Sequence, residues 1–356
     1  MALMPENTNT TAHGIHNMYA ERVAKQENRG YLGWSQIGKS CDRALWLSFR
    51  WAGKRAIPGR IARLFDTGHR EEARVIDDLR AIGCTVYAFD PDTGKQYGVS
   101  SLGGHFKGHL DLVAIGLPEA PKTYHLVDVK TIKTSKFNQL LKDGMEKMYP
   151  EYWAQAHGYI GHQQLERAMF IFVCKDDDRI HCERFNYDKA VFDKYTARAE
   201  KIIKAVEPPI GISTDPTYYE CKFCDHHALC HGTAVPAPTC RSCAFATPEL
   251  DGDARWSCSR HKADIPDAQQ RLGCSSHLFI PVLLVRTAST VDASDTSVTY
   301  RTDLGNQFTN GDPAQHPEHL SSAEIYAVQD KAILGSVAND AFLMEMRTKF
   351  DGRLVA

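Results

Sequence analysis

Two short apolar segments of the chain carry charged residues that could bind a metal ion. Residues 108–113 contain Asp111, and residues 125–130 contain Asp128 and Lys130. Burying a carboxylate or an ammonium group in such a segment is costly unless a partner compensates the charge. Two carboxylates and one ammonium group suit a divalent cation that prefers oxygen ligands, with the lysine beside an attacked phosphate. A buried Asp–Lys ion pair without a metal is the alternative.

Both segments are expected to be β-strands that bring these three groups together. Aliphatic and β-branched residues dominate each segment, and Gly, Pro and Lys-rich stretches bound them. Asp128 and Lys130 are two residues apart, so on a strand they project from the same face. Asp111 joins them if the two strands are neighbours. The full pattern predicts strands near residues 84–89, 106–115, 124–131, 168–174 and 180–185, the last two forming a hairpin.

Helices are predicted before and after these strands. Residues 66–82 carry an apolar stripe at helical spacing, and residues 191–206 form a long amphipathic pattern. Residues 150–165 are also expected to be helical, because Pro150 suits a first helical turn. Gln155 and Tyr159 are four residues apart and therefore share a face of this helix.

The order Gly-His-x-Asp, then Asp-x-Lys, then Gln-x-x-x-Tyr resembles the PD-(D/E)XK nuclease superfamily. It is most similar to the RecB-type exonuclease branch, which includes CRISPR-adaptation and phage recombination nucleases. The resemblance implies an α/β fold with a restriction-endonuclease-like core, in which helices flank a mixed central sheet. It also implies an exonuclease that hydrolyses phosphodiester bonds in DNA processing or recombination, in a phage setting.

The same resemblance implies a set of metal ligands. Asp111, Asp128 and Glu72 would hold one or two Mg²⁺ or Mn²⁺ ions, and the backbone carbonyl of Val129 would be a further ligand. The family usually has Gly-x-x-x-His or an acidic residue at the position of Glu72, and this chain departs from the His version. The neighbouring Glu71 is a competitor for this role, and both could be ordinary solvated charges of a helix.

The remaining catalytic residues follow from the resemblance as well. Lys130 would position or deprotonate the attacking water and stabilise developing charge. Gln155 and Tyr159 would orient Lys130 and the scissile DNA strand. For His109, which lies beside Asp111 in the sequence, a purely structural role and a role in supporting the catalytic residues are equally well supported.

Eleven cysteines, without a signal peptide or an apolar run long enough to span a membrane, predict a reducing compartment. With the resemblance, this implies the cytoplasm of a bacterium or of a phage-infected host cell, and no membrane partner. Cys221, Cys224 and Cys230, together with a lone Cys41 far upstream, resemble the iron–sulfur version of these nucleases. Four thiolates are the standard ligands of a 4Fe–4S cluster and also make an acceptable zinc site. The cluster would tie Cys41, near the start of the domain, to Cys221, near its end.

A second cysteine group lies outside the nuclease likeness. Its members are Cys240, Cys243, Cys258 and Cys274. One C-x2-C pair with two later cysteines is a common zinc arrangement, and His261 or His277 could replace a cysteine. The segment has little apolar material of its own, so we expect a metal to supply its folding free energy. Disulfides are the alternative, which a reducing compartment disfavours.

Four segments are expected along the chain. Residues 1–30 form a flexible N-terminus, and residues 31–235 form the RecB-like nuclease domain, which starts with a helical stretch. Residues 236–285 form the Cys-rich, zinc-binding segment. Residues 286–356 form a C-terminal region without an assignable role; its start is weakly patterned, and residues 320–350 are predicted to be helical.

The formal net charge of −2 means that DNA must be contacted through local basic patches. Two sets are candidates: Lys54, Arg55, Arg60 and Arg63 near the first long helix, and Lys130, Lys133 and Lys136 after the second acidic strand. Phosphate binding by such residues is salt-dependent, and solvated surface charge is the alternative.

The expected partner is single- or double-stranded DNA with free ends, and further partners would be a recombinase or a single-strand-binding protein. No Gly-rich phosphate loop for ATP is present in the sequence. One alternative function is a catalytically silent DNA-binding or assembly module on the same fold. Another is a zinc-dependent transcription-type protein built around the second cysteine group, which leaves the aspartates unexplained.

Overall fold

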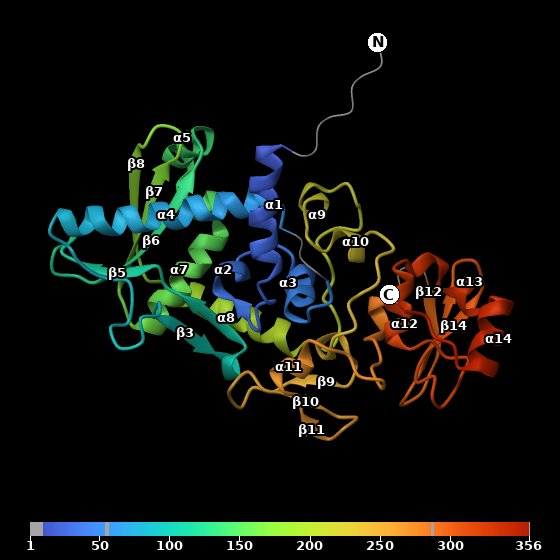
Figure 1. Cartoon of the computed structure of the whole chain (residues 1–356). Coiled ribbons are helices and arrows are strands. Elements are labelled where there is room, and N and C mark those ends of the chain that lie inside the picture. Colours follow the sequence, from blue (N-terminus) through green and yellow to red (C-terminus); the bar gives the residue numbers. More distant parts are fainter. Residues whose placement is uncertain (1–9, 54–56, 286–287, 356) are drawn as a thin grey trace, which may run out of the picture.

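The computed structural model describes residues 10–53, 57–285 and 288–355. Within these ranges, one end of the molecule is built on a mixed five-stranded sheet of order β2-β5-β6-β7-β8, on the left in Figure 1. Its strands are β2 (Thr85–Tyr87), β5 (Leu112–Ile115), β6 (His125–Ile132), β7 (Arg167–Cys174) and β8 (Ile180–Asn186). β6 and β7 are parallel, and the other neighbours are antiparallel. The protein is therefore of the mixed α/β class predicted from the sequence.

Two long helices cover opposite faces of this sheet. On one face, α4 (Gly59–Ala81) packs its apolar stripe against the side chains of Val127 and Val129. On the other face, α7 (Pro150–Gln163) packs against Leu126. Because side chains alternate along a strand, Asp128 and Lys130 project towards the α7 side. No helix in the described ranges is long and apolar enough to cross a membrane.

The parallel pair β6 and β7 requires a crossover, which three helices provide. These are α5 (Thr134–Asp143), α6 (Met145–Met148) and α7. A second helical group, α2 (Trp34–Ile37), α3 (Asp42–Phe49) and α8 (Lys189–Lys204), packs on the outer side of α7, as Figure 1 shows. α8 confirms the helix predicted over residues 191–206, and the indole nitrogen of Trp46 in α3 donates to the carbonyl of Ala205 at its end, at 2.8 Å.

The strand predicted over residues 106–115 is in fact two strands in different sheets. β4 (Phe106–His109) lies in a three-stranded sheet of order β1-β4-β3, with β1 (Leu32–Gly33) and β3 (Gly98–Ser101). β5 follows after only two residues, in the five-stranded sheet. A short 3-10 turn, η1 (Leu102–Gly104), precedes β4. Asp111 therefore lies where the chain passes from one sheet to the other, which a continuous apolar pattern does not reveal.

A helix that was not predicted, α1 (Thr11–Ala24), lies within the N-terminal stretch expected to be flexible. It crosses the start of α4, where a Cβ on Gly59 would lie 1.8 Å from the carbonyl oxygen of His16. No residue of α1 in the described chain is buried, so the helix adds nothing to the apolar core. α4 itself begins at Gly59, after Pro58, rather than near residue 66. The first nine residues lie outside the described ranges.

The Cys-rich segment after α9 (Tyr219–Lys222) and α10 (His227–Cys230) is built from short elements. These are η2 (Cys240–Ser242), β9 (Ala246–Pro248), β10 (Trp256–Cys258), β11 (Ala263–Asp264), α11 (Asp267–Gln270) and η3 (Pro281–Leu283). The segment shares the core of residues 31–235: Trp256 is fully buried, with its ring centroid 5.4 Å from that of Phe49 in α3. α3 thus supplies apolar contacts to a segment that has little apolar material of its own.

Residues 288–355 form a smaller α/β unit with a core of its own (red in Figure 1). Strands β12 (Ala288–Ala293), β13 (Val298–Thr302) and β14 (Gln307–Asn310) make an antiparallel sheet in a region that looked weakly patterned. The helix predicted over residues 320–350 is divided into α12 (Ser322–Val328), η4 (Lys331–Ile333), α13 (Leu334–Ala338) and α14 (Ala341–Phe350). Leu278 and Phe279, from the preceding segment, complete this core.

Candidate active site

Four charged side chains from three separate parts of the chain lie near the first residue of β5. Glu72 comes from α4, Asp111 from the passage between β4 and β5, and Asp128 and Lys130 from β6. Leu112 pairs with Val127, so the same register places Asp111 opposite Asp128. The ammonium nitrogen of Lys130 forms an ion pair with Asp128 and lies 3.8 Å from Asp111 Oδ2. The structure therefore brings together the acidic residues and the lysine predicted from the sequence.

The mutual repulsion of these acids is visible in their pKa values. Burial and then the charge of Asp111 raise the pKa of Glu72 to about 7. Burial raises the pKa of Asp128 to about 7, against the lowering effect of Lys130. Burial alone would lower the pKa of Lys130, but Asp128 and Asp111 raise it above its ordinary value. Three carboxyl groups thus share one ammonium group, an arrangement that a divalent cation would relieve.

Glu72, rather than Glu71, belongs to this cluster. The electrostatic influence of Asp111 and Lys130 reaches Glu72, and Gln96 Nε2 donates to Glu72 Oε1 at 3.5 Å. Glu71 Oε1 instead accepts a bond from the surface residue Arg74 at 3.4 Å. The two neighbouring acids therefore have different surroundings, and the competition left open by the sequence favours Glu72.

The backbone of Val129 adds another oxygen to the cluster. Its N–H donates to Asp111 Oδ2 at 3.4 Å. In a strand, the N–H and C=O of one residue point to the same side, so the Val129 carbonyl points to the same edge of β6 as this N–H. Three carboxylates and one carbonyl oxygen form a donor set that suits Mg²⁺ or Mn²⁺.

Tyr159 and Gln155 of α7 lie against the same cluster. Gln155 Nε2 donates to the Tyr159 hydroxyl at 3.3 Å, and burial followed by the charge of Asp128 raises the pKa of Tyr159. A Cβ on Gly108 would lie 2.4 Å from Cε1 of the Tyr159 ring. The glycine of the Gly-His-x-Asp motif therefore makes room for this ring beside Asp111.

Two residues of the site were missed by sequence reasoning. The ring of Tyr152 lies 5.0 Å from Lys130 Nζ, within range of a cation–π interaction. Its position three residues before Gln155 on the same helix face was the signal that could have found it. Gln96, which binds Glu72, lies outside the named strands, in an isolated β-bridge with Phe89, and gave no signal. His109 is exposed, with its ring centroid 6.4 Å from that of Tyr31.

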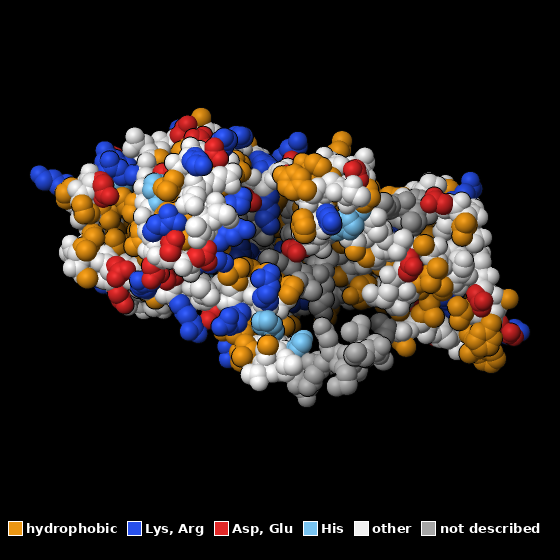
Figure 2. Space-filling model, turned by 90° about the horizontal axis from the view of Figure 1, so that it is seen from above, with side chains coloured by type: hydrophobic (Ala, Val, Ile, Leu, Met, Phe, Trp, Pro, Cys, Tyr) orange, Lys and Arg blue, Asp and Glu red, His pale blue; other side chains and the backbone are white. Residues whose placement is uncertain are grey.

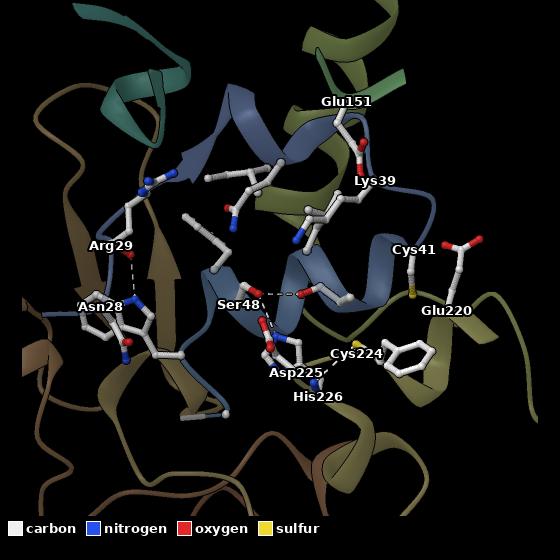
Figure 3. Close-up of a pocket in the computed structure, with 18 of the residues that line it drawn as sticks. Asn28, Arg29, Lys39, Cys41, Ser48, Glu151, Glu220, Cys224, Asp225 and His226 are labelled. Carbon is white, nitrogen blue, oxygen red and sulfur yellow. Dashed lines mark hydrogen bonds between the residues drawn. The ribbon is translucent and has the colours of Figure 1, made fainter. Parts of the chain in front are cut away.

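The first cysteine group also converges in space. Cys41 begins α3, whereas Cys221, Cys224 and Cys230 come from the α9–α10 region. A cavity of about 600 Å³ is lined by three of the four, and Figure 3 shows Cys41 and Cys224 in it. The His226 amide donates to Cys224 Sγ at 3.4 Å. Burial raises the pKa of Cys230, which does not line this cavity, to about 11. Four thiols form a donor set suited to an iron–sulfur cluster.

The second group surrounds a cavity of about 240 Å³. Its lining includes Cys240, Cys243, Cys258 and Cys274, with His261 and His277. Burial raises the pKa of the Cys243 thiol to about 11, although the amides of Leu278 and Phe245 act in the opposite direction.

A third cluster, not singled out from the sequence, lies in the C-terminal unit. Across the described ranges, it is the one group of three whose possible ligand atoms all lie within 4.8 Å of one another. Its members are His316, Glu318 and His319. His316 and Glu318 are exposed, and the His-x-Glu-His spacing was the signal that could have found the group.

Of the predicted basic patches, Lys54 and Arg55 lie outside the described residues. Lys133 and Lys136 are exposed at the start of α5, directly after β6. Arg60 and Arg63 are exposed on the first turns of α4. Figure 2 shows Lys and Arg side chains gathered mainly over the half of the visible face that holds the five-stranded sheet and α4.

No family model and no curated protein matches this chain. Among solved structures, the protein SSO0001 overlaps 64% of this chain and 98% of its own length, at 13% identity and a TM-score of 0.38. LHK-Exo, an alkaline exonuclease from Laribacter hongkongensis, overlaps 52% and 90%, at 15% identity and a TM-score of 0.34. A phage-related exonuclease from Haemophilus somnus overlaps 39% and 68%, at 14% identity and a TM-score of 0.29. TM-scores this low establish no shared fold, so no functional conclusion follows from them.

Proposed function

We propose that this protein is a metal-dependent DNA nuclease with a PD-(D/E)XK core, acting as an exonuclease. The observation that carries the proposal is that Lys130 pairs with both Asp128 and Asp111, while the half-buried Glu72 lies close enough for the charges of Asp111 and Lys130 to act on it. An ion pair between Asp128 and Lys130 would need neither of the other two acids. Gathering two further carboxyl groups at a half-buried site is unfavourable unless a cation balances them.

Each residue of the cluster has a distinct role in this proposal. The three carboxylates and the Val129 carbonyl would hold Mg²⁺ or Mn²⁺. When bound, such an ion lowers the pKa of a water molecule and neutralises charge on the attacked phosphate. Lys130, held by Asp128 and the Tyr152 ring, donates hydrogen bonds to the water or to a phosphate oxygen.

The helix α7 completes the arrangement. Tyr159 is fixed by Gln155 and by close contact with Gly108, so its hydroxyl is held beside the acids. A hydroxyl in this position can donate to a phosphate oxygen of the DNA strand. Gln155 is a positioning residue, because its amide acts through Tyr159.

The test is digestion of end-labelled single- and double-stranded DNA with Mg²⁺ or Mn²⁺. Wild type should shorten the DNA stepwise from its ends, and Asp128→Ala and Lys130→Ala should abolish the cleavage. Lys147→Ala is the matched control, since Lys147 is an exposed lysine paired with Asp143 at 2.8 Å. Cleavage that persists in Asp128→Ala would overturn the proposal. DNA binding by wild type without cleavage would favour the catalytically silent alternative.

The iron–sulfur cluster is a separate part of the proposal. Cys41, Cys221, Cys224 and Cys230 would hold a 4Fe–4S cluster that ties α3 to the α9–α10 region and acts structurally. Protein purified without oxygen should show visible absorption and contain iron, and the Cys221→Ser/Cys224→Ser variant should lose both together with thermal stability. A variant that lacks the absorption band but melts and cleaves DNA like wild type would contradict the structural role.

A further inference from the structure

The cavity of about 240 Å³ in the Cys-rich segment is lined by four thiols and two imidazoles. We propose that it is a zinc site in which Cys240, Cys243 and His277 are ligands and the thiolate of Cys258 or Cys274 is the fourth. The site lies between the core of the nuclease domain and the core of the C-terminal unit. We further infer that the bound zinc holds these two cores together.

The local fold brings the thiols to this cavity from separate elements. Cys240 and Cys243 form a C-x2-C turn in which the amide of Cys243 donates to the carbonyl of Cys240 at 3.1 Å. The β9–β10 hairpin pairs Cys258 with Ala246, three residues after Cys243, and so carries Cys258 to the turn. Cysteine thiolates presented by such a turn and a neighbouring hairpin are frequent ligands of structural zinc.

His277 provides an independent indication of a ligand. The residue is 3% exposed, and its Nε2 lies 2.9 Å from the carbonyl oxygen of Thr239. A carbonyl can only accept, so Nε2 must carry the proton and Nδ1 must present its lone pair. In the described chain, this buried Nδ1 has no hydrogen-bond partner, which is a cost unless something binds there. A ring nitrogen donating to a backbone carbonyl while the other faces an ion is the usual arrangement of a metal-bound histidine.

The possible donor atoms surround the cavity, and Cys274 Sγ lies 3.7 Å from Nε2 of His261. No three of them, among the described residues, lie within 4.8 Å of each other. Zinc–sulfur bonds of about 2.3 Å would bring the sulfur atoms of a tetrahedral site closer than this. Binding therefore includes rotation of cysteine side chains into the cavity, and the site should close around the ion.

The contacts of the same residues show what the ion would hold together. Cys243 belongs to the core of the nuclease domain and pairs with Phe279, which belongs to the core of the C-terminal unit. The amide of Phe279 donates to Asn310 Oδ1 at 3.1 Å, and the Ser322 hydroxyl donates to the carbonyl of His277 at 2.9 Å. A metal bound by Cys243 and His277 would thus link both cores directly.

The first experiment measures zinc and iron in the full-length protein and in variants. We expect one zinc per chain in wild type, and at least tenfold weaker zinc binding in Cys240→Ser/Cys243→Ser and in His277→Ala. Cys182→Ser is the matched control and should keep zinc, since Cys182 lies on β8 and does not line the cavity. Of Cys258→Ser and Cys274→Ser, one should lose zinc and the other should keep it.

Cobalt substitution and proteolysis test the site without relying on variants that fail to fold. Wild type loaded with Co²⁺ should show thiolate-to-cobalt absorption, and removing zinc with a chelator should release the C-terminal unit to protease faster than the nuclease domain. Zinc retained in Cys240→Ser/Cys243→Ser, or wild type that binds neither zinc nor cobalt, would overturn the proposal. So would eight irons per chain, which would mean a second iron–sulfur cluster in this cavity. Unchanged proteolysis after zinc removal would refute the linking role.

Discussion

Glu71 and Glu72 are adjacent acids of α4 with different neighbours, and this difference can be tested directly. Glu72→Gln removes a charge that faces Asp111, so we expect the Mg²⁺ concentration for half-maximal cleavage to rise by at least about tenfold. Glu71→Gln removes a charge whose observed partner is Arg74 at the surface, and should change this concentration less than twofold. Metal titrations of DNA cleavage measure both. Equal effects of the two substitutions would show that Glu72 is not a metal ligand.

Gly108 is expected to matter because of the space it leaves for Tyr159. In Gly108→Ala the new Cβ would overlap the ring, whose Cε1 is 2.4 Å away, and would move the hydroxyl from the acids. Misplacement of a positioning group by about 1 Å can cost about 10²-fold in rate, and we expect a loss of this order in kcat. Gly98→Ala on the neighbouring strand is the control, because its nearest contact would be 3.6 Å away. Wild-type kcat in Gly108→Ala would show that Tyr159 is not needed there.

The site residues that could be predicted from the sequence are those whose spacing matches the repeat of a strand or a helix. Asp128 and Lys130 share a face because strand side chains alternate, and Gln155 and Tyr159 share a face because they are one helical turn apart. The approach of Gln96 to Glu72 depends on tertiary packing, which no local spacing encodes. The close approach of Tyr159 to Gly108 also depends on tertiary packing. The reason for a glycine at position 108 is therefore seen only in the folded chain.

The ends of helices and strands were predicted well where a run of apolar residues ends. They were predicted poorly where the chain turns within such a run. The predicted strand 106–115 divides because residues 110 and 111 pass between two sheets while remaining in an apolar context. The helix α1 was missed for the opposite reason, since its contact with α4 is a close approach of backbones. Neither feature changes the hydrophobic period of the sequence.

The contact between α1 and α4 gives a stability prediction. In Gly59→Ala the Cβ would lie 1.8 Å from the carbonyl oxygen of His16, so α1 must move away and the protein should be less stable. Gly68→Ala lies in the same helix with no atom within 4 Å of its Cβ, and should stabilise the protein by about 0.5–1 kcal/mol. Urea unfolding measures both values, and limited proteolysis reports release of α1. Stabilisation by both substitutions would mean that α1 does not pack at Gly59.

The charge of the molecule is unevenly divided between its two parts. Residues 1–285 contain 36 Lys or Arg and 34 Asp or Glu, whereas residues 286–356 contain 6 and 10. The view in Figure 2 agrees, because basic side chains are sparse over the C-terminal unit. For the proposed function, a DNA strand should therefore be drawn to residues 1–285, and the acidic C-terminal unit should be repelled from it at low ionic strength.

The position of Lys133 and Lys136 makes this electrostatic argument measurable. Both are exposed where β6 leads into α5, close in sequence to Lys130, so a DNA backbone that reaches the acids should pass them. Each lysine that neutralises a phosphate contributes about 0.9 to the slope of log K against log salt for duplex DNA, and about 0.7 for single strands. We expect Lys133→Ala/Lys136→Ala, in an Asp128→Ala background that prevents cleavage, to lower the magnitude of the slope by up to twice these values. Fluorescence anisotropy across a salt series gives the slopes, with Lys147→Ala as the control for removal of a surface lysine. A slope unchanged in the double variant would mean that the DNA approaches the acids from another side, past Arg60 and Arg63 on α4.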